Sequence, residues 1–142
     1  MSYSLSFSQS LIIMLFVASK IEHGAFEFIS TQQIADKLNI PASTSSVILR
    51  RLKKAGLIEA REGVNGGVRL AKLSEQITVL DIFEAVEQSG PMFPTNINLV
   101  ANDAKSTRAQ QSILNVLSNA EDAMKHSLQA VTVKDLMNSM KT

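Results

Sequence analysis

The stretch from residue 30 to residue 72 concentrates the positive charge of a chain that is otherwise slightly acidic. It holds eight Lys and Arg against three Asp and Glu, a net charge of +5, whereas the rest of the chain carries −4 and the whole chain +1. The same stretch reads as two short helices joined by a tight turn and followed by a two-stranded hairpin. This pattern predicts a helix-turn-helix with a hairpin wing, which constrains the fold more than any other segment.

The signals for each of these elements are local. The first helix is predicted over 31–38 after Ser30, the turn over 39–41, and the second helix over 42–55, ending at Gly56. The strands are predicted near 57–61 and 68–71, around the tip Gly63-Val64-Asn65-Gly66-Gly67. We expect the glycines and Asn65 to supply the positive φ values of a tight reversal. The missing side chains would also let a phosphate or a narrow groove come close.

Three helix starts share one capping pattern. A hydroxyl residue precedes each helix and an acceptor side chain follows three residues later, in the pairs Ser30/Gln33, Thr78/Asp81 and Thr132/Asp135. Each pair can satisfy two orphan backbone amides, so these boundaries are well specified.

The remaining periodicities predict helices over 5–22, 78–88, 104–130 and 133–140, with a loop over 89–103 that contains Gly90, Pro91 and Pro94. The predicted fold class is therefore mainly α with a small β-hairpin wing: a winged helix-turn-helix plus a long dimerisation helix. We expect three parts, a winged domain over 1–88, a linking loop over 89–103, and a helical dimerisation region over 104–142.

Composition narrows the class of protein further. The chain has 142 residues, 45% of them hydrophobic, and no cysteine, so it suits one core with an appendage and excludes disulfides and sites held by thiolates. The apolar run 11–18 lacks the basic flank of a signal peptide and is too short to span a bilayer, which favours a fully buried helix. We expect a cytoplasmic protein without a membrane partner.

The helix over 104–130 carries an apolar seam at alternating steps of four and three residues. The seam consists of Ile113, Leu117, Ala120, Met124 and Leu128, continued by Val131. Such spacing is what a helix presents to a paired helix. The stripe could instead pack on its own domain, but the length of the helix and the loop before it favour a second copy of the chain.

The second helix of the motif is predicted to bury Ile48, Leu49, Leu52 and Ala55. The opposite face then presents a polar and basic set: Ser43, Thr44, Ser46, Val47, Arg50, Arg51 and Lys54. The major groove of B-DNA admits one helix, whose first residues read base edges while later cations reach phosphates. We therefore expect double-stranded DNA as the partner, with Arg50 on a guanine or on a phosphate.

The wing and the first helix of the motif would extend this surface. Arg61 and Arg69 flank the tip formed by Asn65, Gly66 and Gly67 and are candidates for a minor groove or a phosphate, while Thr31 and Gln32 begin the first helix. The sequence shows no catalytic constellation, so we predict no enzyme, no metal site and no cofactor. A winged-helix module that binds proteins is the alternative, which the basic segment disfavours.

With these motifs the chain resembles the Rrf-type winged-helix transcriptional regulators, the bacterial group with IscR-like and NsrR-like sensors, and within it the YwnA-like branch. The residues that carry the resemblance are 34–40, 52–58, the wing 63–70 and Ile77-Thr78-Val79-Leu80-Asp81-Ile82. The resemblance implies a homodimeric, sequence-specific regulator on a palindromic site, which we expect to be a repressor.

The departure from this family lies in the loop 89–103. Family sensors hold an iron-sulfur cluster there with cysteines, and this loop has none. Its apolar residues, among them Met92, Phe93, Ile97, Leu99 and Val100, could line a small pocket for an unidentified small-molecule effector or pack on the core, and we favour packing. We expect the regulator to work without a cluster.

Overall fold

The computed structural model describes residues 5–24, 26–87, 90–97, 99–100 and 103–141, which form six α-helices, one short 3-10 helix and one hairpin. The elements are α1 (Leu5–Glu22), α2 (Thr31–Leu38), α3 (Ala42–Lys54), β1 (Ile58–Arg61), β2 (Gly67–Leu70), η1 (Ser74–Gln76), α4 (Val79–Val86), α5 (Ala104–Gln129) and α6 (Val133–Asn138). The predicted fold class, mainly α with a small β-hairpin wing, is confirmed. The 3-10 helix was not predicted, and α4 and α6 each end two residues before the predicted boundary.

The core of the molecule is built around one stripe of α1, which packs against α4, α6 and β2. Ile13, Met14 and Val17 have no exposed surface. The prediction that this helix is fully buried is wrong, because its neighbours cover one side only: Leu5 is 68% exposed and Ile12 is 44% exposed. By length and composition α1 could also cross a membrane, but its buried stripe makes it a core helix of this fold.

The three predicted capping boxes are all present. In the first, the Gln33 amide donates to Ser30 Oγ at 3.1 Å and the Ser30 amide donates to Gln33 Oε1 at 3.0 Å. The equivalent pairs start α4 and α6. A fourth cap starts α5, where the amide and hydroxyl of Ser106 lower the pKa of the Asp103 carboxyl, the side-chain bond being the larger cause. These capping bonds fix where α2, α4, α5 and α6 begin.

The hairpin is extended by a third short segment. β1 and β2 pair antiparallel with Glu59 opposite Arg69, and Ile29 forms a bridge with Val68 on the other side of β2. Gly67 has φ +145°, and a side-chain carbon there would collide with the Ile29 carbonyl. The hairpin is therefore attached to the chain segment just before α2.

Positive φ values occur at two residues of the wing tip and not at all four of the predicted ones. Gly63 and Gly67 have positive φ, but Asn65 and Gly66 do not. Gly66 is required for another reason: a side-chain carbon would meet the carbonyl of Arg61. At Gly66 and Gly67, backbone atoms of the protein itself occupy the space that a side chain would need.

The C-terminal helix α6 returns to the winged domain. The Val79 amide donates to the Val131 carbonyl, and the Val133 amide donates to the Ile77 carbonyl. Val133 and Met137 are buried in the main core. Within the predicted part 104–142, α5 therefore projects from the winged domain, whereas α6 packs in its core. The sequence did not indicate this contact, because α6 lies far along the chain from the residues that it touches. The division of the chain into three parts stays a prediction.

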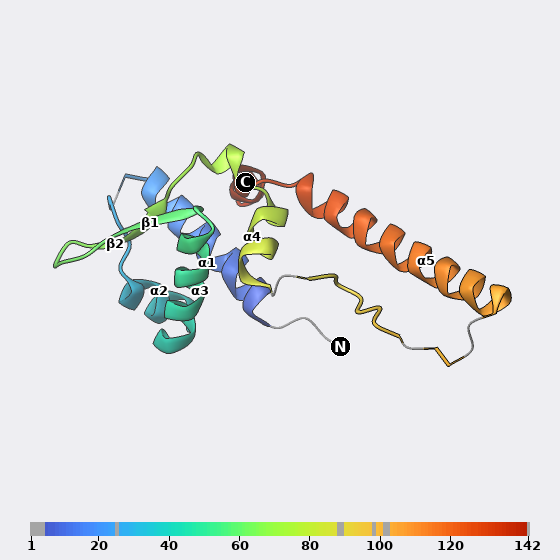
Figure 1. The fold of residues 1–142 in the computed structure, drawn as a ribbon. Helices are drawn as coiled ribbons and strands as arrows, with labels where there is room; N and C mark the ends of the chain where they lie inside the picture. Colours follow the sequence, from blue (N-terminus) through green and yellow to red (C-terminus); the bar gives the residue numbers. More distant parts are fainter. Residues whose placement is uncertain (1–4, 25, 88–89, 98, 101–102, 142) are drawn as a thin grey trace.

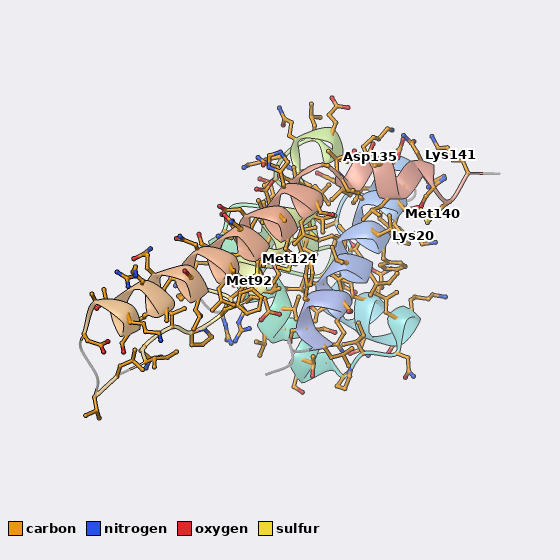
Figure 2. All side chains as sticks on the ribbon, turned by 90° about the vertical axis from the view of Figure 1, so that its right-hand side faces the viewer. Lys20, Met92, Met124, Asp135, Met140 and Lys141 are labelled. Atoms are coloured by element: carbon orange, nitrogen blue, oxygen red, sulfur yellow. The ribbon has the colours of Figure 1, made fainter. Side chains whose placement is uncertain are left out.

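The helix α5 and the segment before it form an arm that projects from the compact part (Figure 1). The helix α5 has 26 residues, which makes it about 39 Å long, and none of its side chains is buried. The preceding segment runs out beside α5 (Figure 1), and the Met92 amide donates to Glu121 at 2.5 Å, one turn from Met124 (Figure 2).

The expectation that this loop packs on the core is wrong. Phe93 is 38% exposed and Ile97 is 51% exposed, while Val100 is fully exposed. The loop follows the projecting helix instead of returning to the winged domain (Figure 1), so its apolar side chains face solvent within a single chain. We use the name arm below for residues 90–97, 99–100 and 103–129.

Candidate nucleic-acid interface

The helix α3 divides into a buried and an exposed face. Ile48, Leu49 and Leu52 lie in the core, as predicted. Ala55 is exposed because α3 ends at Lys54, so its predicted burial is wrong. The face away from the core presents Ser43, Ser46, Val47, Arg50 and Lys54, with Thr44 half-buried. Hydroxyls near the start and cations near the end match the requirements of a helix in a major groove.

The first turns of α3 line a shallow hollow. Ser43, Thr44 and Val47 form one side of it, and Ser6 at the start of α1 forms the other. Ser6 was not among the predicted site residues, because no pattern in the sequence links it to α3. The hollow therefore places Ser6 of α1 beside the residues of α3 that are predicted to contact bases.

Arg51 separates from the other predicted site residues. Its Nη1 donates to the carbonyl oxygen of Val86 at 2.9 Å, at the C-terminal end of α4. Arg50, the preceding residue, is exposed. Arg51 is half-buried and its guanidinium is engaged by Val86, so Arg50 is the arginine that stays exposed near Ser43 and Val47. Arg51 holds α3 against α4.

The wing arginines lie on the face of the hairpin that is turned away from the core. The guanidinium of Arg61 lies 4.3 Å from the centre of the Phe28 ring, and that of Arg69 lies 4.5 Å from it. Arg69 Nε donates to Glu59 Oε1 at 2.6 Å, and both arginines approach Glu27 Oε1, at 3.6 and 3.5 Å. The structure therefore brings the two predicted wing arginines together, beside the carboxylates of Glu27 and Glu59.

The rest of the predicted surface is less uniform. The wing tip turns through a bond from the Gly66 amide to the Gly63 carbonyl, and Val64 is fully exposed at its end beside Asn65. In α2, Thr31 is half-buried and the Gln32 side chain donates to Asp36 Oδ1 at 2.8 Å. Gln32 thus bonds within its own helix in the free chain.

Sequence reasoning missed Glu27 and Phe28. They precede the Ser30 cap by three and two residues, respectively, in a segment without helix or strand periodicity. Their contacts follow from the bridge between Ile29 and Val68, which joins residues far apart in the chain. The nearest available signal was an aromatic residue next to an acidic one before a basic motif.

An exposed polar and basic face of a second helix, with a hairpin wing beside it, defines the class of a winged helix-turn-helix DNA-binding protein. Residues 3–139 match the model of the Rrf2 family, described as an iron-dependent transcriptional regulator. The chain belongs to this family: it is a transcriptional regulator and not an enzyme.

Known relatives agree with this assignment. The regulator NsrR of Shouchella clausii is 33% identical over 135 residues, covering 90% of this chain and 83% of that protein. YwnA of Bacillus subtilis, a regulator by its assigned name, is 29% identical over 115 residues, covering 78% of this chain and 83% of that one. The structure of CymR, the global cysteine regulator of B. subtilis, is similar with a TM-score of 0.72 and 26% identity over 99% of both chains. IscR of T. potens, at 20% identity and a TM-score of 0.73 over 99% of this chain and 89% of that one, shares the fold.

The side chains present do not fit the iron-sulfur cluster that the resemblance implies. The chain has no cysteine and two histidines. Nowhere in the described ranges do three or more His, Asp or Glu gather as ligands of a metal ion would. His23 Nδ1 lies 2.6 Å from the carbonyl of Ser19 in its own helix end. Cluster iron is held mainly by thiolates, so these side chains do not supply the ligands of an iron-sulfur cluster.

Proposed function

We propose that this protein is a homodimeric repressor that binds a palindromic DNA site in the cytoplasm, without an iron-sulfur cluster. The observation that carries the proposal is the exposed face of α3, where Ser43, Ser46, Val47 and Arg50 share one side of a helix whose opposite side is anchored in the core. The hydroxyls would read base edges, Val47 would contact a thymine methyl, and Arg50 would reach a guanine or a phosphate.

Charge supports a DNA partner. The segment from 30 to 72 has a net charge of +5 in a chain of net charge +1. Phosphate contacts supply much of the affinity for DNA and make it depend on salt, so a localised basic surface provides the sequence-independent part of binding. The cations of this surface include Lys54 at the end of α3 and the wing arginines.

The arm supports a dimer. Its apolar side chains are exposed in the single chain: Phe93, Ile97, Leu99, Val100, Ile113 and Val116 are all at least 38% exposed. Large apolar side chains that gather exposed on one projecting segment suit a surface that another chain covers. A second copy of the chain is the proposed occupant, because the seam at Ile113 and Leu117 has the spacing of a helix that pairs with a helix.

A dimer built through the arms would place two α3 helices and two wings on one DNA duplex. Two-fold related recognition helices contact half-sites about one helical turn apart, ~34 Å. Repression would follow if the site overlaps a promoter. A small-molecule effector, if the protein has one, would act by changing the distance between the two α3 helices.

Selection of bound sequences from random double-stranded DNA with the purified full chain tests the proposal. We expect enrichment of one palindromic sequence, and Arg50→Ala should bind that sequence about 5- to 150-fold more weakly. Lys125→Ala, on α5, serves as the matched loss of one positive charge. Absence of enrichment, with binding to protein partners instead, would favour the winged-helix interaction module.

A further inference from the structure

One face of the wing holds two arginines over one aromatic ring, and two glutamates pair with these arginines. Ile29 pairs with Val68, so Phe28 lies across from Arg69, and Arg69 lies across from Glu59 in the hairpin register. Arg61, two residues after Glu59 on the same strand, joins them on this face. The Phe28 ring lies within 4.5 Å of both guanidiniums.

A single carboxylate oxygen serves both arginines. Glu27 Oε1 lies 3.6 Å from Arg61 Nη1 and 3.5 Å from Arg69 Nη1. A negatively charged oxygen between two guanidiniums is the arrangement that a bound phosphate would also adopt, because guanidinium groups bind both anions through the same N–H donors. Glu27 therefore occupies a position suited to a DNA phosphate.

We propose that Glu27 is a gate on the wing: its carboxylate holds Arg61 and Arg69 in the free protein and is displaced by a DNA phosphate when the wing docks. The inference rests on the proposed function. Phe28 keeps the two guanidiniums side by side during the exchange, since a cation over an aromatic face is held without using its N–H donors.

The geometry favours displacement of Glu27 over that of Glu59. The Glu27 side chain is 64% exposed and its two ion pairs are longer than a good hydrogen bond, so water and salt weaken them. Glu59 instead accepts a 2.6 Å bond from Arg69 Nε, which is the length of a strong charge-assisted bond. Glu59 is thus a positioning residue that stays in place, while Glu27 is the carboxylate that leaves.

This gate makes wing binding conditional. A wing whose arginines lacked the Glu27 carboxylate would attract any phosphate more strongly, whereas a wing in which Glu27 pairs with both arginines gains less from non-specific DNA. Contact with the wing would become favourable mainly when α3 is also seated in its site. Glu27 would therefore act as a specificity-determining residue that lowers affinity for DNA of any sequence.

The test is a double-mutant cycle measured by DNA binding of the full chain to its selected site and to random DNA. Glu27→Gln removes the charge of the gate, and Glu62→Gln removes an equal charge from an exposed position of the same wing. We expect Glu27→Gln to tighten binding about 2- to 10-fold at low salt, the combined effect of two exposed ion pairs, and more for random DNA than for the selected site.

The coupling between Glu27 and the two wing arginines decides whether the gate exists. The gain from Glu27→Gln should disappear when Arg61 and Arg69 are both replaced by Gln, whereas any gain from Glu62→Gln should persist. The gain should also shrink as salt rises. An equal gain in both backgrounds, or weaker binding by Glu27→Gln, would overturn the gate. If the unaltered chain binds no DNA, the proposed function itself fails, which is a distinguishable result.

Discussion

The guanidinium of Arg51 donates a hydrogen bond to the carbonyl oxygen of Val86 across 2.9 Å. The bond joins α3 to the last turn of α4, and it satisfies a carbonyl that the end of a helix leaves without a partner. The chain leaves α4 directly after this point and continues into the arm (Figure 1). Arg51 therefore connects α3 to the base of the arm.

Replacement of Arg51 should affect stability, whereas replacement of Arg50 should affect DNA binding. We expect Arg51→Ala to lower the free energy of unfolding by about 1 to 2 kcal/mol, because a hydrogen bond from a charged donor is lost. Arg50→Ala, with an exposed side chain, should change it by less than about 0.5 kcal/mol. Chemical denaturation of both variants measures the difference. Equal stability of the two variants would contradict the role given to Arg51.

Gly67→Ala should detach the wing. A side-chain carbon at this position would collide with the Ile29 carbonyl, and φ +145° is strained for any residue except glycine. We expect a loss of about 1 to 3 kcal/mol in the free energy of unfolding, with faster hydrogen exchange of the amides of Ile29 and Val68. Asn65→Ala in the same turn, where φ is not positive, is the control and should leave both quantities unchanged.

Leu117→Lys should break the proposed dimer. A lysine in the centre of an apolar seam would lose its hydration without gaining a partner, which opposes association. Ser118→Lys adds the same charge one residue further along α5, on another face of the helix, and should leave the dimer intact. Sedimentation of both variants distinguishes them. A dimer that persists in Leu117→Lys would place the interface elsewhere.

Protein purified without oxygen should contain neither iron nor sulfide in stoichiometric amount. The reason is the donor set: a chain with no cysteine and two histidines offers mainly hard oxygen ligands, which suit iron-sulfur clusters poorly. Metal and sulfide analysis together with a visible absorption spectrum checks this. A charge-transfer band with stoichiometric iron and sulfide would refute it.

The features that could be predicted from the sequence are those set by neighbours along the chain. The capping boxes at Ser30, Thr78 and Thr132 depend on residues three positions apart, so the sequence contains both partners of each bond. The buried face of α3 follows from helical periodicity. The hairpin follows from its glycine-rich turn.

The features that could not be predicted depend on residues far apart. Arg51 meets Val86 35 positions later, and Glu27 meets Arg69 42 positions later. Nothing in the periodicity of α3 distinguishes a guanidinium that binds a carbonyl from one that faces DNA. The loop residues Phe93 and Ile97 show the same limit, since an apolar residue does not indicate whether its own domain or a partner covers it.

Hydroxyl-radical footprinting of the full chain on its selected DNA site tests the central proposal most directly. Two α3 helices and two wings held by paired arms should protect two segments related by two-fold symmetry, with centres about one helical turn apart, ~34 Å. Arg50→Ala should weaken both segments together, because each chain supplies the same contact. A single protected segment, or uniform protection of any sequence, would contradict a dimer that reads a palindromic site through α3.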